Sequence, residues 1–408
     1  MSAVAEITRN VPGHVPPELV FEFDIYKDSR INDDVQGSYA DALRDAPDIF
    51  FTPANGGHWM VRRYEAIAEI VKDPEYFSVR EMQIPRVPDP PFFIPLSLDP
   101  PQNIPYRQAM MPLFSPKAVH QLEPKIRQWA VDLIEEVAAK GECDFIRDVS
   151  SRFPVSVFME LMGLPLERLR EFRALADEYF EARTPEDIGK LSGRIIGLMT
   201  DLIELRRREP GSDLVSHILN VEIDGRPILL EEMQAMFFVL FLGGMDTVTN
   251  LTGFTYQQFG SDPVLQDRIA ANPDLIPKFV DEGLRCFGVI NTPRLVVRDV
   301  DRFGVPFRSG DMVLCLLPMA GRDDRMSDHP DRFDIDRARS AHLAFSTGPH
   351  LCIGHILARA EIRILTEEWV KRIPRFSVKP GVRHGFRIGT VQAIESLPLQ
   401  WDVVPASR

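Results

Sequence analysis

The sequence predicts a mainly α protein with small β-sheets, and three observations support this fold class. Apolar residues at helical spacing cover most of the chain after residue 106. Strand-like segments are short and few. The 408 residues are 44% hydrophobic and 26% charged with a mean hydropathy of -0.12, as in ordinary globular proteins. Because no repeat or low-complexity tract divides the chain, we expect a single large domain over 1–408.

The helices follow a proline-rich stretch, residues 85–105, which contains eight prolines. Proline fixes φ and removes a hydrogen-bond donor, so this stretch is predicted to be an ordered loop. Short Gly or Pro segments then separate helix-like patterns. These patterns cover residues 106–139, 146–162, 165–181, 186–208 and 213–220.

The longest predicted helix covers residues 228–259 and is apolar almost all round in its middle. Such a helix is expected to cross the interior of the protein. Its most apolar run, residues 233–245, is shorter than the roughly 18 residues that a bilayer span needs. The sequence therefore predicts a buried core helix and no membrane association.

The strand-like segments are HWMVRR near residue 58, LVVRDV near 295, MVLCLL near 312 and a C-terminal pair between about 385 and 403. A last helix is predicted over residues 353–373. So few strands can form only small sheets beside the helices.

Charge and cysteine usage exclude several classes of function. A net charge of -13 and a pI near 5.3 argue against nucleic-acid binding, which needs a basic surface. The four cysteines are scattered without CxxC pairs, so neither a disulfide framework nor a zinc site is indicated. The first ten residues lack a cationic start and an apolar run, so no secretory signal is expected. These features predict a cytoplasmic protein.

Cys352 stands between two glycines in FSTGPHLCIGHILARAEI, residues 345–362, at the start of a predicted helix. An isolated cysteine is usually a small buried hydrophobe. At a helix N-terminus, however, the helix dipole and unpaired N–H groups favour a thiolate, which is a nucleophile or a metal ligand. The neighbouring histidines are not evident catalytic partners, so we favour a metal ligand. Because no second cysteine is near, the remaining ligands would come from a cofactor, and haem needs only one strong protein ligand.

This segment resembles the FxxGxHxCxG haem-binding loop of the cytochrome P450 family. The matching residues are Phe345, Gly348, His350, Cys352 and Gly354. The resemblance implies the mainly α fold of that family, haem b as cofactor and Cys352 as the iron ligand. Ser346 departs from the family pattern, which has glycine after the phenylalanine.

A second motif, VDEGLRCFG, matches the ExxR pair of the family with Glu282 and Arg285. On a helix surface such a pair contributes only a few tenths of a kcal/mol. In the family the pair is buried and joined by an arginine from a PxRF pattern, which here points to Arg332. The resemblance therefore implies a structural role for these three residues on the proximal side of the haem.

A third motif, GGMDT, lies in the middle of the long central helix. Each mid-helix glycine costs about 1 kcal/mol relative to alanine, so Gly243 and Gly244 indicate close helix packing or a function. The motif resembles the [A/G]GxDT motif of the family, which implies close approach to the haem and a local groove in the helix. Asp246 and Thr247 would then deliver protons to bound oxygen, as catalytic residues of a monooxygenase.

A fourth motif, LDPPQNIPYR, resembles the DPPxHxxxR segment whose arginine binds the haem propionates. Arg107 matches that arginine, whereas Asn103 replaces the usual histidine. Arg294 and His350 are the other propionate contacts that the resemblance implies. Arginine is well suited to bind carboxylates through two hydrogen bonds.

The sequences FIPLSLDPPQ, LGGMDTVTN and SLPLQWD resemble the bacterial camphor-hydroxylase subfamily. A tyrosine of those enzymes hydrogen-bonds the substrate ketone, but Pro91 stands at that position, and Thr292 stands where an acid is expected. We therefore expect a small apolar substrate, such as a terpenoid or a norisoprenoid like an ionone. The predicted pocket residues are Phe92, Phe93, Leu96, Val239, Leu242, Gly243, Ile290 and Val391.

The chain contains no flavin or nicotinamide domain and no cysteine set for an iron–sulfur cluster. The resemblance thus implies a monomer that receives electrons from a separate 2Fe-2S ferredoxin with its NAD(P)H-dependent reductase. Because small ferredoxins are acidic, we predict a local basic patch that includes Arg107, Arg339 and Lys117. Two alternatives remain: a haem-thiolate isomerase or peroxygenase, and a haem-based ligand sensor.

Overall fold

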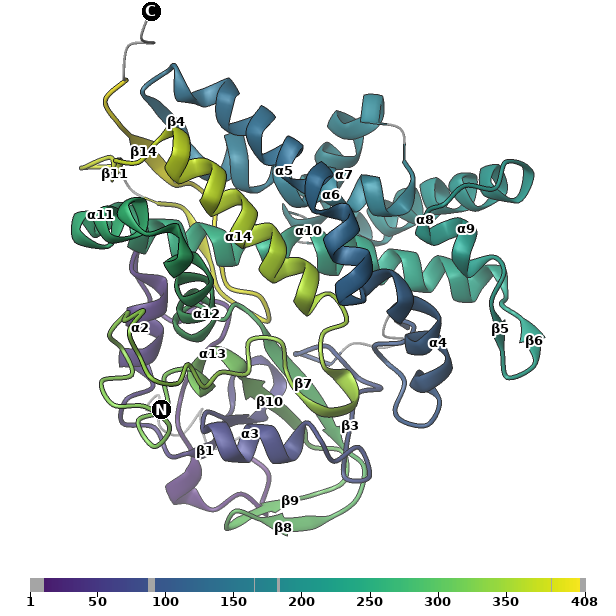
Figure 1. Cartoon of the computed structure of the whole chain (residues 1–408). Coiled ribbons are helices and arrows are strands. Elements are labelled where there is room, and N and C mark those ends of the chain that lie inside the picture. The colour runs from purple at the N-terminus through teal and green to yellow at the C-terminus, as the bar shows by residue number, and fades with distance from the viewer. Residues whose placement is uncertain (1–10, 87–91, 165, 182–183, 383, 404–408) are drawn as a thin grey trace, which may run out of the picture.

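The computed structural model describes residues 11–86, 92–164, 166–181, 184–382 and 384–403 (Figure 1). Helices dominate and the sheets are small, which confirms the predicted fold class. The helices are α2 (Val35–Ala42), α3 (Tyr64–Ile70), α4 (Asn103–Met110), α5 (Pro116–Ala138), α6 (Arg152–Met162), α7 (Leu169–Glu181), α8 (Pro185–Arg208), α9 (Leu214–Ile218), α10 (Leu230–Ser261), α11 (Pro263–Ala271), α12 (Ile276–Cys286), α13 (Leu317–Ala320) and α14 (His355–Arg372).

The strands are short, with two to six residues each. They are β1 (Ile49–Thr52), β2 (His58–Val61), β3 (Phe77–Ser78), β4 (Glu142–Asp144), β5 (Glu222–Ile223), β6 (Arg226–Pro227), β7 (Asn291–Val296), β8 (Val300–Arg302), β9 (Val305–Phe307), β10 (Met312–Leu316), β11 (Ser377–Val378), β12 (Phe386–Arg387), β13 (Ala393–Ile394) and β14 (Pro398–Gln400).

One predicted helix is wrong: residues 106–139 form two α-helices rather than one. α4 ends at Met110 and is followed by a 3-10 turn, η4 (Met111–Phe114). Ser115 then adopts an extended conformation, and its hydroxyl caps α5 by accepting from the N–H of Ala118 at 3.3 Å. Pro116 occupies the first position of α5, where its missing N–H costs nothing.

The main sheet has five strands in the order β1-β2-β10-β7-β3. β10 pairs with β2 in parallel, with Val313 opposite Trp59, and all other pairs are antiparallel. The sheet thus joins N-terminal strands to strands that follow α12. It lies at one end of the molecule, with α3 and α13 beside it and the long helices above it in Figure 1. At the C-terminus, β14 pairs with both β11 and β4.

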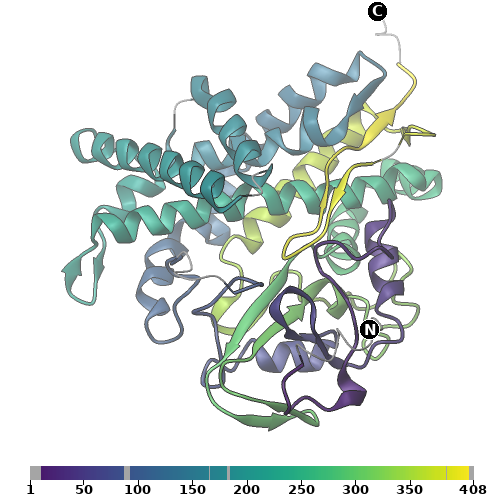
Figure 2. The ribbon, with the colours of Figure 1, turned by 180° about the vertical axis from the view of Figure 1, so that it is seen from behind.

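The central helix α10 crosses the molecule, as Figure 2 shows from behind. Among the described residues it is the one helix long and apolar enough to span a bilayer, but 56% of its most apolar window is buried inside the protein. This burial is that of a core helix, as predicted.

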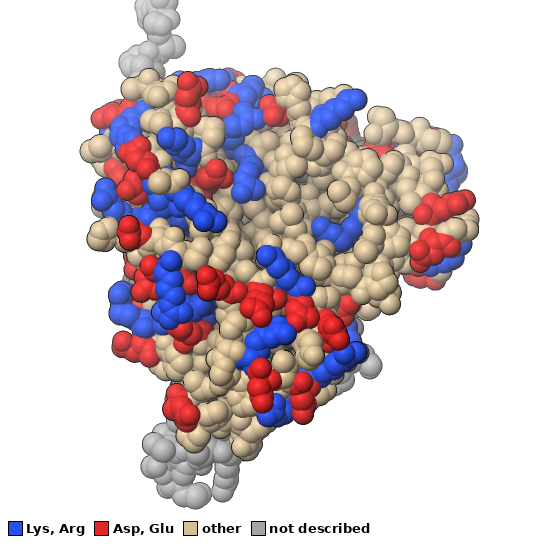
Figure 3. Space-filling model, turned by 60° about the horizontal axis from the view of Figure 1, so that its bottom comes forward, with Lys and Arg blue, Asp and Glu red and all other residues tan. Residues whose placement is uncertain are grey.

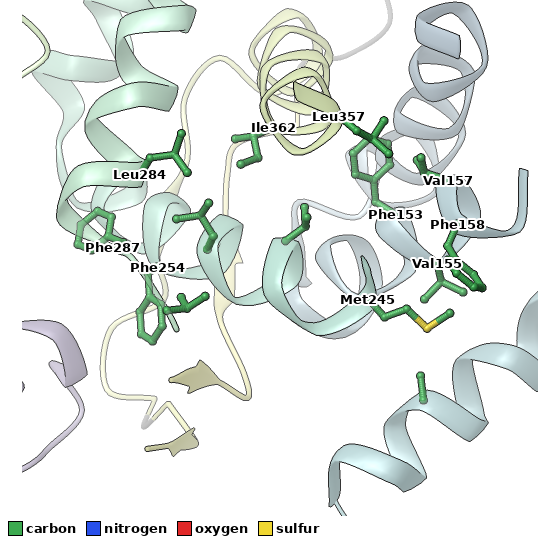
Figure 4. Close-up of a cluster of buried hydrophobic side chains, with 14 of the residues drawn as sticks. Phe153, Val155, Val157, Phe158, Met245, Phe254, Leu284, Phe287, Leu357 and Ile362 are labelled. Carbon is green, nitrogen blue, oxygen red and sulfur yellow. The ribbon is translucent and has the colours of Figure 1, made fainter. Parts of the chain in front are cut away.

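The apolar residues form two clusters. The smaller one surrounds the main sheet and includes Trp59, Phe77 and Phe307, whose rings meet edge to face. The larger one lies among the helices, where α6, α10, α12 and α14 bring together the side chains labelled in Figure 4. Through this packing α14, which follows Cys352, is held against α5 and α12.

Candidate active site

Cys352 lies at the end of a tight loop that precedes α14. Its backbone N–H donates to the carbonyl of Phe345 at 2.9 Å, closing the loop around a 3-10 turn, η8 (Gly348–His350). Gly348 has φ 71°, and a Cβ there would lie 2.8 Å from the side chain of Lys72, so the position requires glycine. The Cys352–Phe345 hydrogen bond and the glycine at 348 thus fix the conformation of the loop that carries the sulfur.

Cys352 is an exposed residue, although protein lies around its thiol. The surrounding protein raises the pKa of the thiol, while the backbone N–H of Gly354 and the charges of Arg107 and Arg359 oppose this rise. A sulfur that accepts a backbone N–H and faces cations is prepared for the thiolate form once a metal binds.

Ser346 retains the backbone that glycine would adopt in this loop. Its φ is 58°, in the left-handed region that costs an L-residue about 1–2 kcal/mol. Its hydroxyl is buried and has no hydrogen-bond partner among the described residues. The departure from glycine therefore leaves the loop geometry intact but adds strain.

The middle of α10 presents an open face, although most of this helix is buried. Val239 and Leu242 are half-buried and Gly243 is exposed, at the spacing of one helical face. A Cβ on Gly243 would have no neighbour within 4 Å. The hydroxyl of Thr247 donates to the Gly243 carbonyl at 2.8 Å. α10 is one continuous helix from Leu230 to Ser261, so the expected local groove does not interrupt it.

Asp246 is held by donors from two elements. Its Oδ1 accepts from the Asn250 amide at 2.9 Å, one turn further along α10. Its Oδ2 lies 3.4 Å from Nη2 of Arg387 in β12. The acid beside Thr247 therefore has a fixed orientation, and neither Asn250 nor Arg387 was predicted from the sequence.

Cations converge near the cysteine loop. Arg107 donates to the carbonyl of Leu351 at 2.6 Å, and Arg294 is buried with Thr292 Oγ1 and the Pro293 carbonyl as acceptors. Burial, with added repulsion from Arg294 and Arg107, lowers the pKa of His350 to about 3. Burial likewise lowers the pKa of both arginines.

Within the described part of the chain, the acceptors of Arg107 and Arg294 are the carbonyls of Leu351 and Pro293 and the hydroxyl of Thr292, and no carboxylate forms an ion pair with either arginine. The buried Oδ1 of Asn103 also lacks a partner among these described residues. Buried charge is tolerated when it is paired, so this region fits a ligand with carboxylates. A haem meets both requirements: its iron suits the Cys352 sulfur and its propionates suit the cations.

The ExxR pair is fully buried: Arg285 donates to both carboxylate oxygens of Glu282, at 2.7 and 2.8 Å. The predicted third member is wrong. The side chain of Arg332 is 71% exposed, and only its backbone carbonyl accepts from Arg285. Arg337 instead brings its Nε to 3.3 Å from Glu282 Oε1. The chain turns back after Arg332, which leaves the later arginine facing the pair.

Two of the predicted pocket residues pair with each other, and a third pairs with a residue that was not predicted. Ile290 and Val391, about a hundred residues apart, form an isolated antiparallel bridge. Phe93 stacks on Phe238 of α10 with ring centroids 6.0 Å apart. Phe92 is 57% exposed and outside this packing, Leu96 is half-buried, and Pro91 lies outside the described residues. Phe238 was missed because its own pattern is that of a buried core residue.

The predicted basic patch is only partly available. Lys117 and Arg339 are exposed, whereas Arg107 is half-buried and engaged with Leu351. On the face in Figure 3, acidic and basic side chains are interspersed, with no large field of one sign.

The fold and this site define a haem-thiolate oxidoreductase, built on a helical protein with one exposed cysteine in a glycine-bearing loop. The family described as Cytochrome P450 matches residues 169–385, and the chain belongs to it. As a member it takes haem b and is a monooxygenase of bacterial type.

Individual relatives agree with this assignment. The crystal structure of CYP101J2, of the camphor-type subfamily, has a TM-score of 0.89 and 34% identity, covering 96% of this chain and 99% of that chain. The probable cytochrome P450 127A1 of Sinorhizobium fredii is 31% identical over 97% of both chains. The linalool 8-monooxygenase of Pseudomonas putida is 28% identical, covering 87% of this chain and 93% of that relative.

Proposed function

We propose that this chain is a single-domain enzyme, over 1–408, that hydroxylates a small apolar terpenoid or norisoprenoid such as an ionone. The observation that carries the proposal is the closed, glycine-bearing loop that presents Cys352, with Arg107 bonded to the carbonyl of the preceding Leu351. Haem held there supplies the activation of O2, and the rest of the site supplies binding and protons.

Each residue has a role in this proposal. Cys352 ligates the iron through its thiolate, within the loop formed by Phe345, Gly348 and Gly354. Arg107, Arg294 and His350 bind the propionates, since they have no carboxylate partners of their own among the described residues. Gly243 would leave room for the flat macrocycle beside α10, because a Cβ there would meet nothing within 4 Å, whereas Gly244 packs toward Phe158 of α6.

Proton delivery is assigned to Asp246 and Thr247. The carboxylate of Asp246 is oriented by Asn250, and the hydroxyl of Thr247 is held one turn back toward Gly243. A carboxyl group can exchange protons with solvent, and a hydroxyl can pass a proton on or hold a water molecule. This acid–alcohol pair favours a monooxygenase over an isomerase, a peroxygenase or a haem-based sensor.

The substrate is inferred from the character of the lining. Phe93, Leu96, Val239, Leu242, Ile290 and Val391 are all apolar and half-buried. These six described side chains contain no hydrogen-bond donor, so they would discriminate by shape, and camphor would bind weakly or in several orientations. The name of the relative linalool 8-monooxygenase, which is a terpenoid hydroxylase, supports the same substrate class.

Electrons are proposed to come from a 2Fe-2S ferredoxin with an NAD(P)H-dependent reductase. The exposed cations Lys117 and Arg339, with Arg107 beside the cysteine loop, would attract an acidic electron-donor protein. Rising salt concentration would screen this attraction and weaken the docking. We further propose that the enzyme is monomeric and cytoplasmic, with α10 buried as a core helix.

The test combines spectroscopy with turnover. The ferrous protein under carbon monoxide should show the far-shifted Soret band of thiolate ligation, and Cys352→Ala should lose it. With a ferredoxin, its reductase and NADH, β-ionone should yield a hydroxylated product. A normal Soret position, or NADH oxidation with neither product nor dependence on β-ionone, would contradict the proposal; equal product from hydrogen peroxide alone would indicate a peroxygenase.

A further inference from the structure

Both carboxylate oxygens of Asp246 are engaged, and they are engaged differently. Oδ1 takes the Asn250 amide at 2.9 Å, a contact between neighbouring turns of one rigid helix. Oδ2 takes Nη2 of Arg387 at the longer distance of 3.4 Å. The acid side chain is 12% exposed and that of Arg387 is 25% exposed, so this ion pair is only partly screened by solvent.

Arg387 belongs to a hairpin that also reaches the proposed substrate pocket. β12 pairs with β13 through Phe386–Ile394 and Arg387–Ala393. Between these strands Val391 forms its bridge with Ile290. The same turn is bound to the start of β7 and to the segment before it, because Asn291 N–H donates to the Thr390 carbonyl and Gln392 N–H donates to the Val289 carbonyl.

The turn between the strands is also fixed from inside the protein. The fully buried side chain of Gln392 accepts a 2.6 Å hydrogen bond from the Gln36 amide in α2. Asn291 donates to the Gly389 carbonyl at 2.8 Å. A displacement at Val391 would therefore be carried along a short, well-bonded hairpin to Arg387, four residues earlier.

We propose that Arg387 is a positioning residue for Asp246, and that the β12–β13 hairpin couples the substrate-facing Val391 to the orientation of this acid. The inference rests on the proposed function and deepens it. A carboxylate whose two oxygens are both occupied by donors must exchange one donor before it can pass a proton. The Arg387 contact is the one that exchanges, because it is longer and comes from a separate element.

The test uses the carbon monoxide stretching band of the ferrous holoenzyme, which needs neither substrate nor partner protein. Asp246→Asn is expected to shift this band, because it changes a polar group near the ligand. Arg387→Gln is expected to shift or broaden it in the same way, Arg387→Lys should largely restore the wild-type band, and Asp246→Asn/Arg387→Gln should match Asp246→Asn alone. Arg375→Gln, which removes a surface ion pair with Asp267, is the matched control and should leave the band unchanged.

Turnover gives a second measure. With β-ionone, the fraction of NADH electrons recovered as product should fall about fivefold in Arg387→Gln with little change in KM, the size expected for one partly screened ion pair. An unmoved band in Asp246→Asn or in Arg387→Gln, or additive effects in the double variant, would overturn the inference. A raised KM with an unchanged band would make Arg387 a substrate contact instead. Failure of the proposed function can be told apart from failure of this inference, because in the former case the wild type itself would lack the far-shifted Soret band.

Discussion

The Nε of Arg337 lies 3.3 Å from Oε1 of the fully buried Glu282, whereas Arg332 presents its side chain to solvent. Two arginines in one irregular segment thus have opposite environments. Only the later one shares the buried charge of the Glu282–Arg285 pair.

This relationship predicts different effects for two similar substitutions. Arg337→Ala should destabilise the protein by about 3 kcal/mol, because it removes one partner of a buried charge network. Arg332→Ala should change the free energy of unfolding by less than about 0.5 kcal/mol, as surface changes usually do. Urea unfolding of both variants measures the difference. Equal losses would show that Arg332 belongs to the network.

The left-handed backbone of Ser346 predicts a stabilising substitution. Ser346→Gly should relieve about 1–2 kcal/mol of strain and lose part of this gain to the greater freedom of glycine in the unfolded chain. We expect a net gain of about 1 kcal/mol, seen as a higher midpoint of thermal unfolding. Ser346→Ala is the control: it removes the buried hydroxyl but keeps the Cβ that causes the strain, so it should recover less. An equal gain in both variants would assign the effect to the hydroxyl.

Glu361 predicts a specific pH dependence. Burial raises the pKa of this carboxyl to about 8, and its Oε2 has no partner among the described residues. The folded state therefore keeps a proton that the unfolded state loses above its ordinary pKa of 4.5. Stability contributed by this group must fall as pH rises from about 4.5 to about 8.

The measurement compares Glu361→Gln with the wild type by urea unfolding at pH 5 and pH 8. From pH 5 to pH 8 the free energy of unfolding of the wild type should fall by a few kcal/mol relative to that of the variant, because the amide of the variant does not titrate. Glu209→Gln, at the exposed end of α8, should follow the wild type at both values. A constant difference between Glu361→Gln and the wild type would show that Glu361 ionises normally in the folded protein.

Substitution of Arg294 is expected to change the rate at which the protein loses haem. If its buried guanidinium binds a propionate, Arg294→Gln should lose a charge-assisted hydrogen bond worth about 1.5–3 kcal/mol, or roughly 10–100-fold in the rate of haem loss. Transfer of haem to excess apomyoglobin measures that rate. Arg298→Gln, which removes an exposed ion pair with Glu75, should retain haem as the wild type does. An unchanged rate in Arg294→Gln would remove Arg294 from the propionate contacts.

Elements with a strong local pattern could be predicted from the sequence. α8 and α10 begin and end within about two residues of their predicted limits, because helical periodicity and apolar content are local properties. Residues 106–139 were predicted as one helix because Pro112 and Ser115 interrupt the pattern too briefly to outweigh it. Their effect depends on backbone angles rather than on hydrophobicity.

The candidate site could be predicted as a set of motifs but not as a set of contacts. The positions of Cys352 and of Asp246 follow from short motifs. Arg387 approaches Asp246 from 141 residues away, and no local signal marks it among the other surface arginines. The choice of Arg337 over Arg332 likewise depends on how an irregular segment folds back, which residue patterns do not encode.

The strand β14 has a practical consequence for protein engineering. Residues Pro398–Gln400 are hydrogen-bonded between β11 and β4, and the Trp401 indole donates to the Ala138 carbonyl at 3.0 Å. A C-terminal truncation that removes these residues would break the hydrogen bonds of β14 to both β11 and β4. It would also remove the contact of Trp401 with the end of α5. A reductase module fused at this end should therefore start its linker after Asp402.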